Sequence, residues 1–502
     1  MYLGIDCGTQ SLKVLAWDPI NGTSDSASES YDLIGNLPPG YKEQHPYNWI
    51  DALEGCMGAL RQQGVDLSAV RGIGVSGQQH GLVVLDSSHR VIRPAKLWND
   101  TSTEAHCRSI LEAAGGISSY MDEIGNALPP GFTASKIAWI KEHEPDSYLR
   151  IRSLMLPHDY LNFYLTGEMT AESGDASGTG YFRVRQRAWS TQALSWIDPD
   201  RDLQACLPRL IQSNEPAGVL RVPLAQKWGM RSAVAISSGG GDNMMGAIGS
   251  GNVSPGTLTV SLGTSGTLYS CSSSPVIDPR GEVAAFCSSS GEWLPLVCTM
   301  NVTVATEMIR TGFFGAGLAD FDRQIEQVPA GSEGLLLLPY LEGERVPNSP
   351  KGTGVLLGIR PATASPPYLA RAAMEGVTLG LKYGLERLKE LGLAPNEIRL
   401  IGGGSRSRVW RGIAADVLGV TCVSPRNEEG PAFGAALQAA WCDQGGEITT
   451  LVKECVELDE ATRQVPDQRL RSLYEELYEV YAKLSETLVE SDVFPSHRRF
   501  IE

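Results

Sequence analysis

The apolar positions of residues 47–62 follow the spacing of one helix face. Trp49, Ile50, Leu53, Met57 and Leu60 recur with polar or small residues between them. An α-helix turns once every 3.6 residues, so side chains with this spacing lie on one side of the helix. The pattern therefore predicts an amphipathic helix over residues 47–62.

Short apolar runs bounded by turn residues predict β-strands around this helix. The order at the start of the chain is three strands, one helix and then another strand. A Rossmann dinucleotide-binding domain alternates strands and helices, so this order argues against one. In the first half we expect strands at residues 3–6, 13–17, 31–34, 72–76, 82–85 and 233–237, and a further helix at residues 244–248.

The second half repeats this organisation, so we expect a domain boundary near residues 251–254. The chain then divides into residues 1–250 and residues 251–502. A tail at residues 468–490 has the pattern of an amphipathic, charge-laced helix on the outside of the second domain. The other predicted elements are strands at residues 257–262, 267–270, 399–401 and 421–423, and helices at residues 366–388, 407–418 and 431–441.

Length and composition indicate an ordinary globular protein. The chain has 502 residues, which is too many for one core, with 42% hydrophobic and 20% charged residues. Its net charge of −16 argues against a nucleic acid partner, since binding to phosphate backbones requires a basic surface. ATP stays compatible, because a few local N–H groups and one cation outweigh a distant negative surface.

Cysteine usage and hydropathy indicate a cytoplasmic location without a membrane partner. The ten cysteines are scattered and form no CxxC pair, so we expect reduced thiols and neither a disulfide scaffold nor a zinc site. No segment reaches the roughly 18 uninterrupted apolar residues of a membrane-spanning helix. The first residues predict a short strand and not a signal peptide.

Two turns far apart in the chain are near copies of each other. One contains Gly8, Thr9, Gln10 and Ser11 after the first strand, and the other contains Gly263 and Thr264 after the strand at residues 257–262. Backbone N–H groups in such turns converge on phosphate, and glycine allows close approach. Two related domains holding one nucleotide would explain the duplication, whereas two ordinary β-hairpins are the alternative.

Two charged residues flank the first of these turns. Asp6 ends the opening strand, where a carboxylate is suited to hold Mg²⁺ through water; a turn-capping aspartate is the alternative, and taken alone the residue favours it. Lys13 lies on the following strand and is a candidate to reach a terminal phosphate; a solvated lysine is the alternative.

A second aspartate follows three consecutive glycines. Asp242 comes directly after Gly239-Gly240-Gly241 and begins a predicted helix. It is either a helix N-cap or a general base that takes a proton from a substrate hydroxyl. The three glycines remove side-chain bulk around it, which a cap does not require.

Polar and aromatic residues suited to sugar binding occur in two other turns. Gln79 and His80 lie in a glycine-flanked turn, where hydrogen-bonding side chains could recognise hydroxyl groups. Trp98 begins a Trp-Asn-Asp segment that would supply an aromatic wall. A surface turn and a core tryptophan are the respective alternatives.

A third glycine-rich turn follows a strand in the second half. Gly402, Gly403, Gly404 and Ser405 would let a base or ribose lie against bare backbone, or they form a tight turn without a ligand. This turn does not have the GxGxxG pattern, and GxxxxGK[ST] does not occur in the chain, so the motif indicates neither a Rossmann nor a P-loop protein.

Together these segments resemble the FGGY family of carbohydrate kinases over nearly the whole chain, from Met1 to about Cys442. Residues 5–11 are similar to the family's first phosphate loop, residues 262–266 to its second, and residues 402–407 to its adenosine motif. Its first signature is similar throughout to residues 131–143. Its second signature is similar to residues 354–359 and 369–375. It departs at Tyr368, where the family usually has a polar or charged residue; we interpret this as sequence divergence at the start of a helix and not as a loss of activity.

The segments that select the sugar resemble the xylulokinase members most closely. Gly77-Gln78-Gln79-His80-Gly81 is similar to their sugar loop, where glycerol kinases carry an Arg-Glu pair. Residues 97–100, 158–161 and 339–345 are also similar. Lys42 departs from the tryptophan common at its position, in a segment expected to be peripheral.

The resemblance implies an α/β fold of two ribonuclease-H-like domains, as in actin and hexokinase. ATP would lie in the interdomain cleft, mainly on the second domain, and the sugar mainly on the first. Asp6 and Asp242 are expected to face each other across this groove. The implied reaction transfers a phosphoryl group from ATP to D-xylulose, with Asp242 as base, Asp6 positioning Mg²⁺, and Gln79, His80, Trp98 and Asn243 orienting the ketose.

Three other functions stay open at this point. The acceptor could be another ketose or polyol, such as D-ribulose. An actin-fold ATPase that changes shape would hydrolyse ATP without sugar and would need neither Gln79, His80 nor Trp98. A sugar sensor without catalysis is the third, against which the presence of both Asp6 and Asp242 argues. A homodimer agrees with the family, although no surface patch for it is evident in the sequence.

Overall fold

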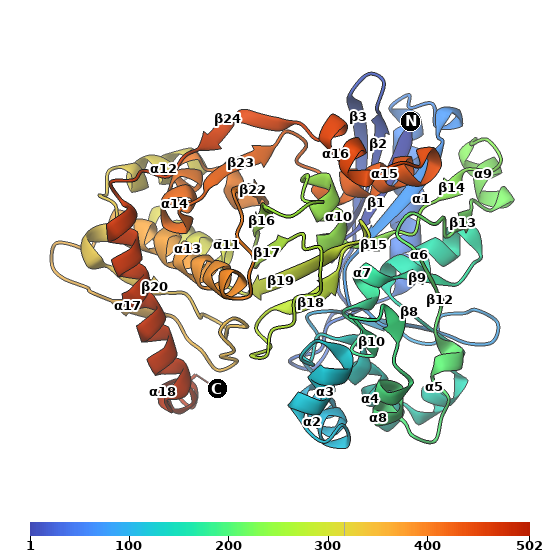
Figure 1. Cartoon of the computed structure of the whole chain (residues 1–502), viewed down its shortest axis with the longest axis horizontal. Coiled ribbons are helices and arrows are strands. Elements are labelled where there is room, and N and C mark those ends of the chain that lie inside the picture. Colours follow the sequence, from blue (N-terminus) through green and yellow to red (C-terminus); the bar gives the residue numbers. More distant parts are fainter. Residues whose placement is uncertain (316, 502) are drawn as a thin grey trace.

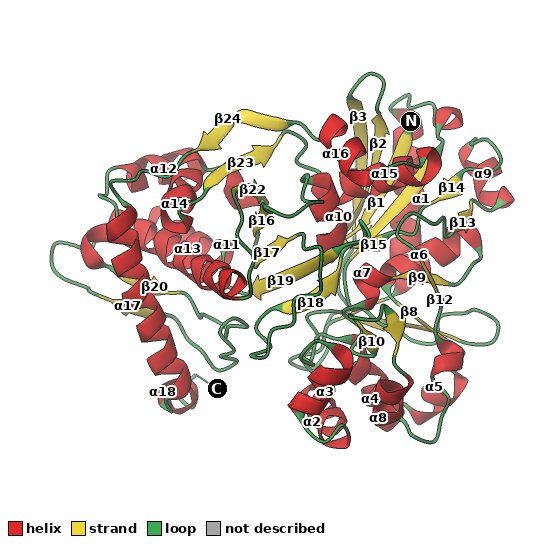
Figure 2. Ribbon diagram, in the orientation of Figure 1, coloured by secondary structure: helices red, strands yellow, loops and turns green. Residues whose placement is uncertain are grey.

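The computed structural model describes residues 1–315 and 317–501, which form two lobes (Figure 1). Figure 2 shows helices flanking the strands of each lobe. In the described chain, the N-terminal lobe contains a seven-stranded sheet in the order β13-β14-β5-β1-β2-β3, with β15 paired to β5. Its strands are β1 (Tyr2–Cys7), β2 (Ser11–Asp18), β3 (Thr23–Ser30), β5 (Gly72–Gly77), β13 (Gly218–Val219), β14 (Ala235–Ile236) and β15 (Gly240–Gly241).

The C-terminal lobe repeats this pairing. Among the described residues its sheet also has seven strands, in the order β18-β19-β17-β16-β22-β23-β24. In each lobe the first strand pairs antiparallel to the second and parallel to a later strand: β1 to β2 and β5, and β16 to β17 and β22. The strands are β16 (Thr257–Leu262), β17 (Gly266–Ser270), β18 (Ala284–Cys287), β19 (Trp293–Thr299), β22 (Glu397–Ile401), β23 (Thr421–Pro425) and β24 (Leu458–Gln464).

The third strand of the first sheet is not where the sequence predicted it. The prediction at residues 31–34 was wrong, because the strand is β3 and residues 31–34 form a loop. β3 lies at the sheet edge and buries only Ala27, so its polar sequence gives no apolar signal. Tyr31 instead donates its hydroxyl to the Gly8 carbonyl (2.7 Å) and supports the first glycine turn.

The predicted helices are present with ends shifted by a few residues. They correspond to α1 (Pro46–Gln62), α10 (Asp242–Gly249), α13 (Pro366–Glu390), α14 (Arg408–Leu418), α15 (Gly430–Gln444) and α17 (Arg471–Glu490). α17 lies on the outer side of the C-terminal lobe, as its charged pattern indicated (Figure 1).

The remaining elements are short. Other helices are α2 (Glu104–Ala113), α3 (Ile117–Ile124), α4 (Thr133–His143), α5 (Pro145–Arg150), α6 (Pro157–Thr166), α7 (Ser173–Ala176), α8 (Thr191–Ile197), α9 (Val222–Trp228), α11 (Thr303–Ile309), α12 (Leu318–Glu326), α16 (Ile448–Cys455) and α18 (Val493–Arg498). Two-stranded pairs join β4 (Glu43–Gln44) to β7 (Ala95–Lys96), β6 (Val83–Leu85) to β8 (Ser153–Met155), β9 (Thr170–Glu172) to β12 (Arg209–Ile211), β10 (Phe182–Arg183) to β11 (Ala188–Trp189) and β20 (Leu336–Leu338) to β21 (Val355–Leu357).

Helix α15 crosses the predicted domain division. It belongs to the second half of the sequence but packs on β1 and β5 of the first lobe (Figure 1). Glycines permit this approach: a Cβ on Gly4 would lie 1.7 Å from the Ala432 carbonyl oxygen, and one on Gly74 would lie 2.0 Å from that of Ala435. The domain division at residue 250 stays a prediction based on the repeated sequence pattern, because α15 comes after this residue and still packs against the first sheet.

The cysteines are all unpaired, as expected, and seven of the ten are buried. Within the described residues, no helix combines the length and apolar character that a membrane span requires.

Candidate active site

The two candidate aspartates lie at the same edge of the N-terminal sheet. Asp6 of β1 pairs with Ser76 of β5, and Ser76 pairs on its other side with Gly240 of β15. Asp242 follows two residues later at the start of α10. Strand β5 therefore lies between the two carboxylates, and neighbouring strands in a sheet are about 4.8 Å apart. The sequence expectation had the two carboxylates facing each other across the interdomain groove, whereas the structure places both on the first lobe, at one edge of its sheet.

Burial changes the acidity of both carboxyl groups. Loss of solvation and, after it, the nearby charge of Asp6 raise the pKa of Asp242 to about 7, against the opposing effect of two hydrogen bonds from Asn243. Burial likewise raises the pKa of Asp6 to about 6, against the opposing effects of the Ser76 hydroxyl (2.8 Å) and Lys13. A carboxylate with a pKa near neutrality is suited to accept a proton at physiological pH.

Lys13 lies opposite Asp6 in the β1–β2 pair and is not a free cation. Its ammonium group forms an ion pair with Glu429, which directly precedes α15. α15 thereby brings a third carboxylate close to Asp6. The carboxylates of Asp6 and Glu429 and the ammonium group of Lys13 therefore lie together near the end of β1.

The first glycine turn is bound to the predicted sugar wall. Trp98 donates its indole N–H to the Thr9 hydroxyl (3.0 Å), and that hydroxyl donates to Gln78 Oε1 (3.2 Å). Gln44 donates to the Thr9 carbonyl (2.5 Å). The structure thus places Trp98 beside residues 8–11, although nothing in the sequence linked them.

Gln79 and Asn243 lie beside Asp242, and His80 follows Gln79 in the same turn. Asn243 Nδ2 donates to Gln79 Oε1 (2.9 Å) and to Asp242 Oδ1 (2.9 Å). The His80 ring packs near Phe132, with ring centroids 4.7 Å apart, and its Nδ1 is buried without a hydrogen-bond partner among the described residues. Burial lowers the pKa of His80 well below its usual value, and the charges of Lys136 and Arg345 lower it further, so the imidazole is neutral.

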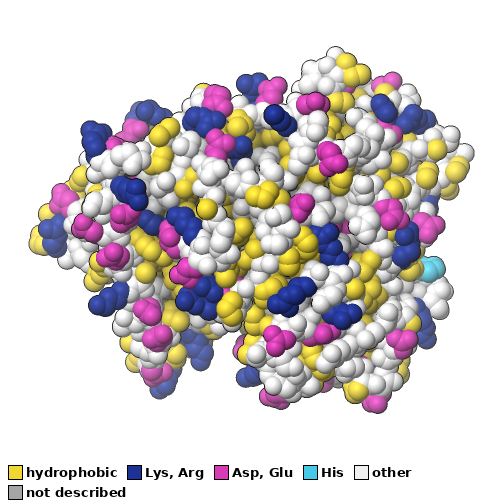
Figure 3. Space-filling view, viewed as in Figure 1, with side chains coloured by type: hydrophobic (Ala, Val, Ile, Leu, Met, Phe, Trp, Pro, Cys, Tyr) yellow, Lys and Arg dark blue, Asp and Glu magenta, His cyan; other side chains and the backbone are white. Residues whose placement is uncertain are grey.

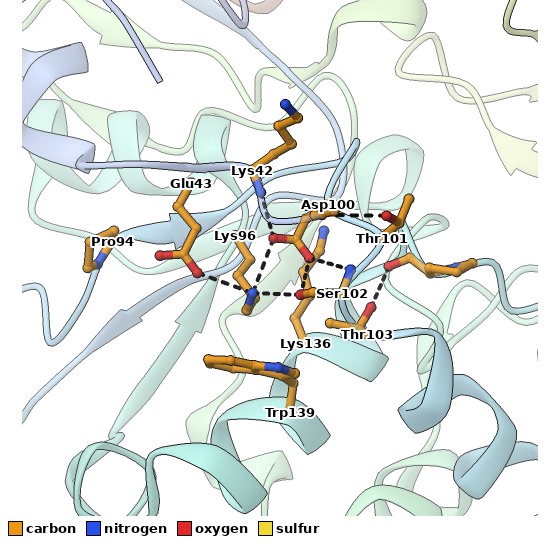
Figure 4. A network of polar contacts seen from close by, with 12 residues as sticks. Lys42, Glu43, Pro94, Lys96, Asp100, Thr101, Ser102, Thr103, Lys136 and Trp139 are labelled. Carbon is orange, nitrogen blue, oxygen red and sulfur yellow. Dashed lines mark hydrogen bonds and ion pairs between the residues drawn. The ribbon is translucent and has the colours of Figure 1, made fainter. Parts of the chain in front are cut away.

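A buried ion network fixes the turn behind Trp98 (Figure 4). Lys96 is fully buried and pairs with Glu43 (3.1 Å) and Asp100 (3.1 Å). Its ammonium lies 4.0 Å from the centre of the Trp139 ring. Asp100 also accepts the backbone N–H of Lys42 (2.9 Å). These contacts fix Asp100, the last residue of the Trp98-Asn99-Asp100 turn.

The two predicted nucleotide turns of the second lobe adjoin each other. β16 and β22 pair up to Ser261 and Ile401, so the turns that follow both strands lie side by side. Gly402 has a φ of +84°, and a Cβ there would lie 2.9 Å from the Leu262 backbone. The Gly263 and Thr264 carbonyls accept N–H groups at the start of α11 (2.9 and 3.0 Å).

Two further residues contact the predicted sugar-binding residues, although neither was predicted as a site residue. Arg345 places its guanidinium 5.5 Å from the Trp98 ring centre and 3.7 Å from Cys298 Sγ, so it joins the C-terminal half to the sugar wall. Asp175 lies 2.6 Å from His158 Nδ1 and interacts with Gln79. Arg345 lies in a segment similar to xylulokinases, whereas no local sequence signal marks Asp175.

The lobes are in contact over the upper part of the molecule and separated by a notch at its lower edge (Figure 3). Tyr269 of β17 shows their contact, because a Cβ on Gly246 of α10 would lie 2.8 Å from its hydroxyl. Duplicated sheets, glycine turns on both lobes and carboxylates at the strand ends of the first lobe define a two-domain α/β protein of the ribonuclease-H-like class, which is the expected fold.

The chain belongs to the FGGY family of carbohydrate kinases. The family's N-terminal domain matches residues 1–249 and its C-terminal domain matches residues 258–442. A xylulose kinase of Haemophilus influenzae is 38% identical over 96% of this chain and 98% of its own length. A xyloylose kinase from Brucella ovis superimposes with a TM-score of 0.90 at 34% identity, over 97% of this chain and 99% of the other. A gluconate kinase from Lactobacillus acidophilus, at 23% identity, has a TM-score of 0.91 over 98% of both chains and shows the fold alone.

Proposed function

We propose that this chain phosphorylates D-xylulose at its C5 hydroxyl with ATP, giving D-xylulose 5-phosphate and ADP. The observation that carries the reaction type is the position of Asp242, a carboxylate with a pKa of about 7 beside Asp6, Gln79 and Asn243. The names of the full-length relatives support xylulose as the acceptor. The shared fold does not, because a gluconate kinase has it too.

Asp242 would act as the general base. Its carboxylate accepts the proton of the C5 hydroxyl as that oxygen forms a bond to the γ-phosphorus and the bond to the ADP oxygen breaks. The hydrogen bonds from Asn243 N–H and Nδ2 (2.8 and 2.9 Å) fix the direction of the carboxylate. Phosphoryl transfer depends mainly on alignment and charge neutralisation, so a well-oriented acceptor supplies much of the rate.

The residues around Asp6 fit Mg²⁺. Asp6 presents a carboxylate whose Oδ1 is held by Ser76, with Glu429 nearby, and Mg²⁺ prefers such oxygen ligands together with water. We assign Asp6 as its holder through water. When bound, Mg²⁺ neutralises charge on the β- and γ-phosphates.

The glycine turns would hold ATP. We assign the phosphates to residues 8–11 and to Gly263 and Thr264, with Lys13 as a nearby cation, and the adenosine to residues 402–405. Close approach needs bare backbone, which three consecutive glycines at residues 402–404 provide, and the φ of +84° at Gly402 is one that favours glycine. His80, Gln79, Trp98 and Asn243 would orient the ketose.

D-Xylulose is expected to be the best acceptor in a panel of pentuloses, hexuloses and polyols. The measurement is ADP release in one coupled assay, compared as kcat/KM. D-Ribulose differs only in the configuration of one hydroxyl, and a site that hydrogen-bonds hydroxyl groups loses binding when one is misplaced. A higher kcat/KM for D-ribulose or a polyol would replace the proposed acceptor. ATP hydrolysis at the same rate without any sugar would favour a conformational ATPase.

Activity is expected to rise with pH through about 7. Asp242 must be deprotonated to accept a proton, and its pKa is raised to about 7, so the active form is lost below that pH. In this range kcat/KM for the sugar should fall about tenfold for each pH unit. A profile that stays flat from pH 5.5 to 8 would contradict this assignment.

A further inference from the structure

His80 has a backbone conformation that needs support. Its φ is +64°, in the left-handed region that non-glycine residues rarely adopt. It lies in the turn between β5 and Leu82, the turn from which Gln79 contacts Asn243 beside Asp242. Such conformations persist where the surroundings fix them, and they occur often at ligand sites.

Two side chains of helix α4 hold the His80 peptide. Lys136 Nζ donates to the His80 carbonyl at 2.5 Å, and Thr133 Oγ1 donates to the same oxygen at 3.2 Å. Lys136 also donates to the Gly131 carbonyl at 2.7 Å. Both side chains are fully buried, and they are one helical turn apart on the same face.

The His80 ring is confined as well as its backbone. The ring centroid lies 4.7 Å from that of Phe132 and 5.7 Å from that of Phe286. A Cβ on Gly178 would lie 2.0 Å from Cε1 of His80, so only glycine fits there. These neighbours leave the imidazole ring little room to move. A shift of the His80 peptide would therefore displace the ring from its position between them.

The ammonium group of Lys136 is buried, and the carboxylate of Asp100 lies close enough to affect its charge. Burial lowers the pKa of Lys136 to about 7; Asp100 opposes this effect, and the charge of Lys96 adds to it. Figure 4 shows Lys136 beside the Lys96–Asp100 network that holds the Trp98 turn. One cluster therefore supports both turns that carry the candidate sugar contacts.

We propose that Lys136 is a positioning residue for sugar recognition. Lys136, assisted by Thr133, clamps the His80 carbonyl and so holds the imidazole where a ketose hydroxyl reaches it. This inference rests on the proposed function for its ligand, a small polyhydroxylated sugar. Lys136 is not a catalytic residue, because it contacts backbone carbonyls and not the reacting atoms.

The test compares three variants with the wild type. Lys136→Met keeps length but removes the donor, Thr133→Val removes the second donor, and Lys141→Met changes a partly exposed lysine of the same helix as a control. Lys136→Met is expected to raise the KM for the accepted sugar by about 10- to 100-fold, with the KM for ATP within about twofold. Thr133→Val should raise the sugar KM by about three- to tenfold, and Lys141→Met should leave both unchanged.

The outcomes separate this proposal from the proposed function. The panel of acceptors is first assayed with the wild type and identifies the sugar that it phosphorylates best. If that sugar is not D-xylulose, the proposed acceptor is replaced, and the KM values of the variants are measured with the sugar that was identified. A folded Lys136→Met with wild-type sugar KM, or with both KM values raised equally, overturns the clamp. If Lys136→Met does not fold, Thr133→Val decides by the same criterion. Should the wild type phosphorylate no sugar, the His80 imidazole NMR signals decide: a shift in Thr133→Val but not in Lys141→Met supports the clamp, and unchanged signals overturn it.

Discussion

Replacing Asp242 with asparagine is expected to lower kcat by about 10²–10⁴ with little change in the KM for ATP. The amide keeps the shape of the side chain and its contact with Asn243 but cannot accept the proton of the sugar hydroxyl. The measurement is steady-state ADP release with saturating D-xylulose. Asp122→Asn, which changes an exposed carboxylate on α3, is the matched control and should retain wild-type activity.

Stability supplies an independent check on the same variant. The pKa of Asp242 is about 7 in the folded protein against an ordinary aspartate value of 3.8, so its stabilising contribution is complete below pH 3.8 and lost as pH rises through about 7. At pH 8 the wild type therefore contains a buried charge that the amide lacks. At pH 8 the melting temperature of Asp242→Asn should therefore be no lower than that of the wild type, which would show that the variant is folded. Near-normal turnover in such a folded variant would contradict the role of Asp242 as general base.

Replacing Asp6 with asparagine is expected to lower kcat by about 10²–10³ at fixed Mg²⁺. The amide can still accept the Ser76 hydroxyl bond, so the turn should keep its shape, but the negative charge that attracts the cation is gone. The measurement is kcat across a Mg²⁺ titration. The concentration of Mg²⁺ needed for half-maximal activity should rise, and excess Mg²⁺ should restore part of the rate.

The two aspartate variants should differ in their response to Mg²⁺. Asp242→Asn lacks the proton acceptor, so added Mg²⁺ should not recover its activity. If both variants responded equally to Mg²⁺, the two carboxylates would share one role and the separate assignments would fail. If Asp6→Asn showed wild-type dependence on Mg²⁺, Asp6 would not hold the cation.

Local chemistry was sufficient to predict most elements. The helix over Pro46–Gln62 follows from its apolar spacing, and the turns at Gly8-Thr9 and Gly263-Thr264 follow from glycine between two apolar strands. β3 could not be predicted in this way, because an exposed edge strand needs few apolar residues and Ala27 is its one buried position among those described. Asp175 was missed because a short helix with one acidic residue has no distinguishing pattern.

The duplicated turns, the triple glycine before Asp242 and the family resemblance were determined by the sequence itself, because they depend on neighbouring residues. Only the tertiary structure decided that Asp6 and Asp242 share one sheet edge, that α15 brings Glu429 to Lys13, and that Lys136 holds the His80 carbonyl. Strand register and helix docking join residues far apart in the chain, and the raised pKa values follow from the burial that this joining creates. Sequence spacing does not contain that information.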